Sequence, residues 1–337
     1  MFRPAKSSLL ALTCVLNLQA APPSQSRQGT RLDLQVRVTR PEVGPAGSLV
    51  KLTLSTAESA YAKASTYSKT IEAGSFEVSF RSLEPGDYTL VATHPQLGEI
   101  RRTVVVSRDL ADTKGVVRME IAYTGDQPVS MQQGTGTLTQ LSIPDSAKRL
   151  YGEAQKRIVQ RDSSGAFDKL QQAVAIAPQF ATGWNALGVL TIQTRSDAGA
   201  QVDAETYFRR AVEADASEFE ALLNLGGLLL KSGRQDEALT YNRRAADERP
   251  GDGLANSQLG MNFYQLGELD KAEHFLLIAK RLDPAQYTLP QLFLAEIYAR
   301  KGNRSAALAE LEQLLADRPN DPLLGAVRTA IVKLKGQ

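Results

Sequence analysis

Reactive side chains are scarce in this sequence. Its 337 residues include one cysteine, Cys14, and two histidines, His94 and His274. A disulfide needs a second cysteine, and a thiolate zinc site or a Cys–His dyad needs these residues in groups. The composition excludes all three, so an enzyme would have to rely on carboxylates, hydroxyls or amines. We expect a protein without enzymatic activity, metal or cofactor.

An excess of charge of one sign is lacking as well. The 39 Lys+Arg and 37 Asp+Glu give a net charge of +2. The balance holds within the chain, with 12 basic and 11 acidic residues in 31–124 and 24 and 25 in 145–337. Long-range attraction to nucleic acid or anionic lipid needs concentrated charge. The sequence therefore predicts no nucleic-acid partner.

The first residues resemble a signal peptide. Arg3 and Lys6 precede the apolar run 8–18, which is shorter than the ~20 residues that span a bilayer but suits the apolar region of a signal peptide. Ala20 is a small residue suited to cleavage, whereas Cys14 lies in a poor context for lipoprotein processing. A buried N-terminal helix is the structural alternative.

Cleavage after Ala20 would leave Ala21 first. We therefore expect a signal peptide at 1–20, a disordered leader at 21–30 and an exported protein, periplasmic or extracellular, with no membrane span after cleavage.

Residues 31–124 have the pattern of a small β-sandwich. Leu32, Leu34, Val36 and Val38 alternate with polar residues, as in a half-buried strand. Six further short runs follow, separated by turn residues. They are 49–54, 65–71, 76–80, 88–92, 100–106 and 116–123. Seven short strands without a helical stretch favour a sandwich.

The segment 74–92 resembles the carboxypeptidase regulatory-like (prealbumin-like) family. Leu83 precedes a Pro-Gly turn, and Tyr88 opens the next strand. The resemblance implies a β-sandwich and indicates little about function. Related surface domains can form a Lys–Asn isopeptide bond, but no asparagine occurs between Asn17 and Asn185. A Lys–Asp variant with Lys51 or Lys69 is left open.

Two shorter features complete this half. His94 precedes a proline, has no ligand-type partner nearby in the sequence, and is interpreted as a turn residue. Residues 125–146 have little apolar content and are predicted to be a linker. Asp145 or Ser146 is the expected N-cap of a helix that follows. Because neither pattern crosses the linker, the two halves are expected to fold independently.

The last 190 residues contain an internal repeat. Four positions with identical spacing recur 38, 34, 34 and 35 residues apart. The first set is Ala166, Leu170, Ala173 and Pro178, and the later sets begin at Ala204, Ala238, Ala272 and Ala307. A Leu-Gly or Leu-Ala pair precedes each of the last four sets.

This pattern resembles the tetratricopeptide repeat (TPR), a 34-residue helix–turn–helix unit. The resemblance implies five repeats at 147–180, 181–218, 219–252, 253–286 and 288–321, with a capping helix at 322–337. The expected fold class is multidomain α and β, with a small N-terminal β-sandwich followed by an all-α TPR solenoid. Two departures are a longer turn around 195–201 and the polar Asn242 at a bulky apolar position.

The resemblance also implies a concave groove that binds a partner peptide or protein. The candidate groove residues, carried over by repeat position, are Asn185, Val189, Leu223, Asn224, Lys231, Met261, Tyr264, Gln265, Glu296 and Arg300. The alternative is a glycan or cell-surface polymer binding module in the β-sandwich, with the repeats as a stalk. Glycan sites usually present exposed aromatic side chains, whereas Phe76, Phe80 and Tyr88 are expected to be buried or to anchor turns.

Overall fold

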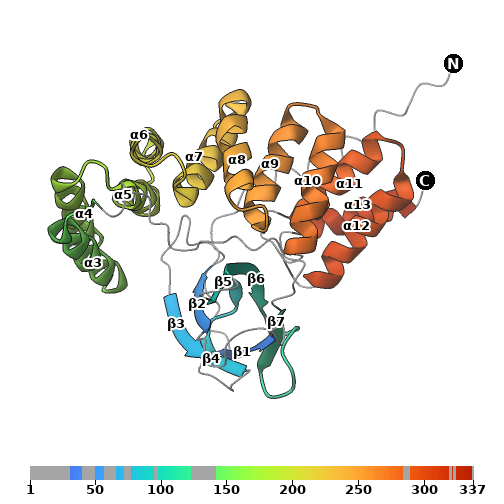
Figure 1. The fold of residues 1–337 in the computed structure, drawn as a ribbon. Helices are drawn as coiled ribbons and strands as arrows, with labels where there is room; N and C mark the ends of the chain where they lie inside the picture. Colours follow the sequence, from blue (N-terminus) through green and yellow to red (C-terminus); the bar gives the residue numbers. More distant parts are fainter. Residues whose placement is uncertain are drawn as a thin grey trace.

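A computed structural model describes residues 31–39, 50–56, 66–71, 77–94, 98–122, 142–283, 289–318, 321 and 324–335. Within these ranges seven strands are followed by eleven helices. Figure 1 shows the strands gathered in a small unit beneath an arch of helices. The expected fold class, a β-sandwich followed by TPR-like helices, is confirmed. The signal peptide, the leader and most of the linker lie outside the described residues.

The β-rich part consists of two facing sheets. One sheet has the order β4-β1-β7 and the other has the order β3-β2-β5-β6. All neighbouring strands are antiparallel except β1 and β7, which run parallel. The strands are β1 (Leu32–Thr39), β2 (Val50–Thr56), β3 (Thr66–Ile71), β4 (Glu77–Leu83), β5 (Gly86–His94), β6 (Gly98–Val106) and β7 (Val116–Ala122).

The period-two pattern places the apolar residues between the sheets. Every second residue of β1, from Leu32 to Val38, is at most 2% exposed. Phe80 and Tyr88 are also buried, as expected. The Tyr88 hydroxyl donates a hydrogen bond to the Glu84 carbonyl at 2.8 Å, which anchors the start of β5. Burial raises the pKa of Tyr88 to about 12.

Two of the expectations for this domain concern His94 and Lys69. His94 is the last residue of β5 rather than a turn residue, and it is only 4% exposed. It pairs with Gly98, so the ladder continues through this position. The Lys69 ammonium donates to the Ser79 carbonyl at 2.7 Å and lies 6.0 Å from the centre of the Phe80 ring, and neither partner is an aspartate.

The helices form five antiparallel pairs and a final helix. In each pair we call the first helix A and the second B. The pairs are α3 (Asp145–Val159) with α4 (Ser163–Ile176), α5 (Ala181–Thr194) with α6 (Ala198–Ala214), α7 (Phe219–Lys231) with α8 (Gln235–Glu248), α9 (Gly253–Gln265) with α10 (Leu269–Leu282), and α11 (Pro290–Arg300) with α12 (Arg304–Asp317). The last helix is α13 (Gly325–Lys335), and it packs Val327 and Ile331 into one cluster with Leu311.

Glycines at the recurring spacing allow close packing within the second, third and fourth pairs. A Cβ added at Gly188 would lie 2.4 Å from the Phe208 ring, and one at Gly260 would lie 2.7 Å from Leu276 Cγ. A larger residue on the A helix would therefore push the B helix away. Gly233 has φ +75° in the turn between α7 and α8, a conformation that glycine adopts without steric cost.

The two departures from the repeat pattern have simple structural solutions. The extra residues of the second repeat do not lengthen the turn, because α6 starts at Ala198 and runs for 17 residues. Asp197 caps this helix by accepting a hydrogen bond from the Gly199 amide at 3.0 Å. Asn242 is fully buried and donates to Asn262 Oδ1 at 3.0 Å, so a hydrogen bond between repeats replaces the apolar contact.

The first repeat helix starts slightly earlier than predicted. Pro144 is the N-cap of α3, and Asp145 is its first residue rather than its cap. Proline is extended at this position, which suits the residue before a helix, and the Asp145 carboxylate still lies in the first turn. None of the described helices has the length and apolar character needed to cross a membrane.

Candidate protein-binding surface

The A helices line the inner side of the helical array. Contacts join α5 to α7, α7 to α9 and α9 to α11, whereas successive B helices of the described chain meet at most marginally. Helices on the inside of a bend lie closer together, so the A helices face the concave side. All predicted groove residues lie on these helices. We call this set the A-helix surface: Asn185, Val189, Leu223, Asn224, Lys231, Met261, Tyr264, Gln265, Glu296 and Arg300.

Exposure divides the A-helix surface into accessible and buried members. Leu223 is 3% exposed and Glu296 is fully buried, so neither offers much side chain to a partner. Lys231, Gln265 and Arg300 are exposed. The remaining residues are half-buried, a state in which part of a side chain is fixed and part is accessible. They are Asn185, Val189, Asn224, Met261 and Tyr264.

Two amides connect neighbouring repeats on this surface. Asn224 on α7 donates to Asn185 Oδ1 on α5, with a nitrogen–oxygen distance of 2.9 Å. An asparagine side chain offers two N–H donors and a carbonyl with two lone pairs, so this bond uses only part of the capacity of each. The pair is therefore held in place and can still hydrogen-bond a peptide backbone.

An aromatic and charged cluster lies further along. The Arg300 guanidinium lies 4.9 Å from the centre of the Tyr264 ring and donates to the Tyr264 hydroxyl at 2.8 Å. Arg300 also donates to Glu296 at 3.0 Å, and the Phe293 ring meets the Tyr264 ring edge-on at 5.4 Å. Burial, and then the charge of Glu296, raise the pKa of Tyr264 to about 12. The phenol therefore remains neutral and can donate a hydrogen bond at physiological pH.

Sequence reasoning missed two residues that shape the same surface. A Cβ added at Gly227 would lie 2.8 Å from the Gln258 amide nitrogen, so this glycine admits the Gln258 side chain against α7. Phe293 supports Tyr264, as described above. Gln258 and Phe293 occupy the same repeat position as Asn224. Extending that position through every repeat would have found both.

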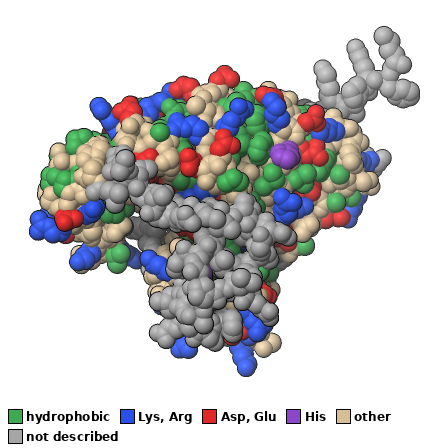
Figure 2. All heavy atoms as spheres, in the orientation of Figure 1, with side chains coloured by type: hydrophobic (Ala, Val, Ile, Leu, Met, Phe, Trp, Pro, Cys, Tyr) green, Lys and Arg blue, Asp and Glu red, His purple; other side chains and the backbone are tan. Residues whose placement is uncertain are grey.

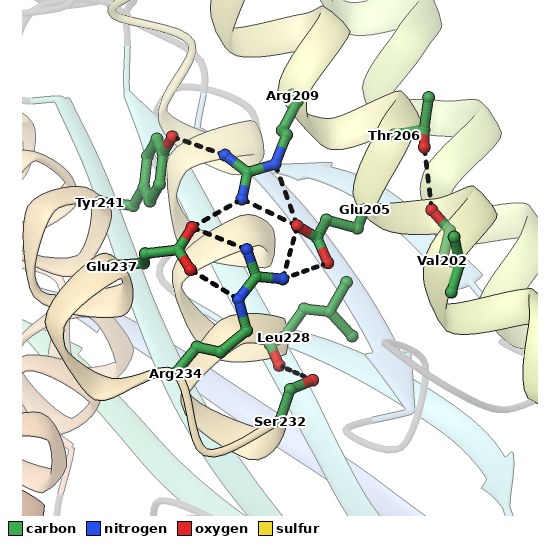
Figure 3. Close-up of polar contacts among 9 residues, drawn as sticks. All are labelled: Val202, Glu205, Thr206, Arg209, Leu228, Ser232, Arg234, Glu237 and Tyr241. Carbon is green, nitrogen blue, oxygen red and sulfur yellow. Dashed lines mark hydrogen bonds and ion pairs between the residues drawn. The ribbon is translucent and has the colours of Figure 1, made fainter.

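A polar network joins two B helices on the other side of the array (Figure 3). Arg234 at the start of α8 donates to both oxygens of Glu205 on α6 at 2.8 Å. Arg209 donates to Glu205, to Glu237 and, at 3.0 Å, to the Tyr241 hydroxyl. Burial alone would raise the pKa of Glu205, but the two arginines outweigh it and lower the pKa. Because its charges pair with one another, we interpret this network as a link between two repeats and not as a ligand-binding site.

Other kinds of site find no support in the described ranges. No group of three or more His, Cys, Asp and Glu side chains there is arranged to hold a metal ion. On the face shown in Figure 2, basic and acidic side chains are interspersed over the helices, in line with the balanced composition.

Comparisons with known proteins point to the same repeat. Residues 203–253 match the family model described as tetratricopeptide repeat. The chain is 28% identical over 163 residues to anaphase-promoting complex subunit 3 of Schizosaccharomyces pombe, covering 48% of this chain and 24% of that protein. It is 31% identical over 169 residues to cellulose synthase operon protein C of Xanthomonas axonopodis pv. citri, covering 48% and 11%. The chain thus spans about a quarter or less of each relative.

Solved structures show a similar partial likeness. MamA from Desulfovibrio magneticus RS-1, residues 41 to the end, matches with a TM-score of 0.46 and 20% identity over 53% of this chain and 99% of that chain. YrrB, described as a TPR protein with an unusual peptide-binding site, matches with a TM-score of 0.47 and 22% identity over 57% and 97%. The spacing and the helix pairs give the helical part of this chain a TPR-like arrangement, and within it residues 203–253 match the tetratricopeptide repeat model.

Proposed function

We propose that this protein is a non-enzymatic scaffold whose A-helix surface binds an extended or helical segment of a partner protein. The observation that carries the proposal is the row of half-buried polar and aromatic side chains that continues over successive A helices. Asn185 and Asn224 can hydrogen-bond a peptide backbone, and Met261 and Tyr264 can contact an apolar side chain. Lys231 lies at the end of α7, where it can meet a carboxylate.

The anchoring residues should be measurable individually. We expect Tyr264→Ala and Asn224→Ala each to weaken binding by about 1–2 kcal/mol, because central, half-buried anchors carry most of the binding energy of an interface. The ligand for this measurement is a peptide selected from a random library on the immobilised protein. Its affinity for each variant is measured by calorimetry.

The matched control is Leu277→Ala, which removes a 40% exposed side chain from the B helix α10. It should bind the selected peptide normally, and all three variants should keep the helical circular dichroism of the parent. Normal binding by both A-helix variants, together with loss of binding on deletion of residues 31–124, would show that the sandwich is the recognition domain.

The alternative function is binding of a glycan or cell-surface polymer by the sandwich. The described part of the sandwich gives this alternative little support. Three aromatic residues of the sandwich are described: Phe80 and Tyr88 are buried, and Tyr67 is half-buried against the same core. Phe76 lies outside the described residues. The described part therefore presents no fully exposed aromatic ring to a sugar. We also propose that the sandwich belongs to the carboxypeptidase regulatory-like family, because Leu83 precedes a Pro-Gly turn and Tyr88 follows it.

We propose further that the protein is exported to a periplasmic or extracellular location. The proposal rests on the basic residues Arg3 and Lys6, the short apolar run after them and the small residue Ala20. Sequencing the N-terminus of protein expressed with its full leader should find Ala21 first. Recovery of cytosolic protein that still begins at Met1 would refute export.

A further inference from the structure

One edge of the sandwich lies against the junctions between repeats. The edge is β6, which pairs only with β5 in its sheet. In Figure 1 these two strands are the part of the sandwich nearest to the helices. Polar contacts join them to the junctions α6–α7, α8–α9, α10–α11 and α12–α13. The sandwich thus meets four successive junctions of the helical array.

At the first two junctions the sandwich forms ion pairs with the helices, through a basic residue in one pair and an acidic residue in the other. Arg101 on β6 lies 2.7 Å from the Glu220 carboxylate at the start of α7 and 3.5 Å from the Asp252 carboxylate at the start of α9. Its neighbour on the same strand face, Glu99, lies 3.3 Å from the Arg249 guanidinium. Both sides therefore carry alternating charges that match one another.

The contacts continue along the strand to the later junctions. The Thr103 backbone N–H donates to both oxygens of Asp283, at 3.0 and 2.9 Å, and its hydroxyl donates at 2.7 Å. Asp87 on β5 is paired with the residue two positions beyond Thr103, and its carboxylate lies 2.8 Å from Arg318 Nη1. The Thr103 N–H, which lies at the open edge of the sheet, is thus bonded to Asp283 of the solenoid.

The spacing of the strand residues shows why long side chains are needed to reach successive repeats. Alternate residues of a strand point the same way and are about 6.6 Å apart, whereas packed helices are about 8–10 Å apart. Successive residues on one side of the strand are therefore closer together than successive helices. Long arginine side chains make up the difference: Arg101 reaches both Glu220 and Asp252, and Arg249 and Arg318 reach the strands from the helices. Arg249 is also held in place, because its guanidinium lies 4.0 Å from the Phe219 ring centre.

The contact is electrostatic rather than apolar. Each buried apolar cluster of the described residues belongs either to the sandwich or to the helices, and none includes residues of both. The charged groups are nevertheless largely covered, with Arg318 6% and Asp283 4% exposed. Burial alone would raise the pKa of Glu220, but Arg101 and Arg249 outweigh it and lower the pKa. Burial raises the pKa of Asp283.

We propose that the sandwich is a reversible electrostatic brace that fixes the curvature of the solenoid from α7 to α13. A solenoid bends at its inter-repeat junctions, because each repeat contacts only its neighbours. A pair of strands, β5 and β6, that is bonded to four consecutive junctions prevents them from bending separately. Because no shared apolar core holds the contact, salt or charge reversal releases it. This inference does not depend on the peptide-binding proposal.

Spin-label distances across the braced repeats test the proposal in the full chain. The labels are attached at Thr240→Cys on α8 and Val332→Cys on α13, both exposed positions, with Cys14→Ser as background. The disrupting variant is Arg101→Glu with Asp87→Arg, and the control variant is Arg118→Glu with Glu77→Arg on the opposite sheet. Both variants reverse one basic and one acidic residue, so the net charge is unchanged.

The parent and the control should give one narrow distance distribution, and the disrupting variant should give a distribution at least twice as wide. Adding Glu220→Arg and Arg318→Asp to the disrupting variant should make the distance distribution narrow again, because each reversed charge regains an opposite partner. Unchanged helical circular dichroism shows that the helices remain folded. A distribution in the disrupting variant that matches the parent would overturn the proposal.

A second measurement needs no variant. Limited proteolysis within residues 125–140 should leave two fragments that co-elute in gel filtration at 0.05 M salt. They should separate at 1 M salt, where the Debye length falls to about 3 Å. Fragments that separate at low salt, or that remain together at 1 M salt, would contradict a reversible electrostatic brace.

Discussion

Replacing Leu276 with alanine should lower the free energy of unfolding of the solenoid by about 2–5 kcal/mol, the range for truncating a buried leucine. Leu276 on α10 is 0% exposed and packs against the A helix α9, where Gly260 leaves no gap beside it. The same side chain belongs to the largest cluster of the central repeats, with Phe263 and Leu294. Its loss therefore weakens packing within one repeat and between two.

The next residue along the chain is the matched control. Leu277 is 40% exposed, so Leu277→Ala should change the free energy of unfolding by less than about 1 kcal/mol. Denaturant titration followed by helical circular dichroism measures both variants. Because repeat arrays can unfold in parts, tryptophan fluorescence from Trp184 in the second repeat should be followed in the same titration. Equal effects of the two substitutions would show that the packing of α10 is not as described.

The periodic parts of the structure were accessible from the sequence because each periodicity has a local physical cause. The alternation of Leu32, Leu34, Val36 and Val38 places one face of a strand in the core, and this face is buried as expected. The recurrence of a small residue such as Gly188 four positions after a large one reflects the close approach of two helices. Such patterns repeat, so several imperfect copies support one interpretation.

The brace could not be predicted from the sequence in this way. The residues of the Arg101–Glu220 pair are 119 positions apart, and those of the Arg318–Asp87 pair are 231 positions apart. Each is an ordinary charged residue in its local context, and neither contributes to a periodic pattern. Nothing in the sequence therefore indicated a contact between the two halves, which the structure joins through polar contacts that only the folded arrangement brings together.

Burial within the A-helix surface was unpredictable for a related reason. Repeat position indicates which side of a helix a residue occupies, but not how far neighbouring helices cover it. Glu296 shows the difference, since it occupies a concave position and is nevertheless fully buried. Its partner Arg300 lies one helical turn away on α11 and also contacts Tyr264 of the preceding repeat. Residues such as Tyr264 and Arg300 are therefore better candidates for partner contact than Glu296.

The same substitution at two glycines should have opposite effects on stability. In Gly188→Ala the added methyl group would lie 2.4 and 2.6 Å from two carbons of the Phe208 ring, and this ring is 2% exposed and cannot swing aside. Relief requires the two helices of the second repeat to move apart. We expect the free energy of unfolding to fall by about 1–3 kcal/mol, as for other overpacked cores.

Gly152→Ala is the matched comparison. Gly152 lies in the middle of α3, and apart from the adjacent residues and backbone of its own helix no atom lies within 4 Å of an added Cβ. Alanine reduces the conformational freedom of the unfolded chain and favours the helix, so this variant should gain about 0.4–1 kcal/mol. Both are measured by denaturant titration of the helical circular dichroism signal. If the two variants shift the transition in the same direction, the close approach of α5 and α6 at Gly188 is not what makes glycine necessary there. A third variant, Gly188→Ala with Phe208→Leu, should recover part of the loss, because the smaller side chain withdraws the ring atoms that the methyl group meets.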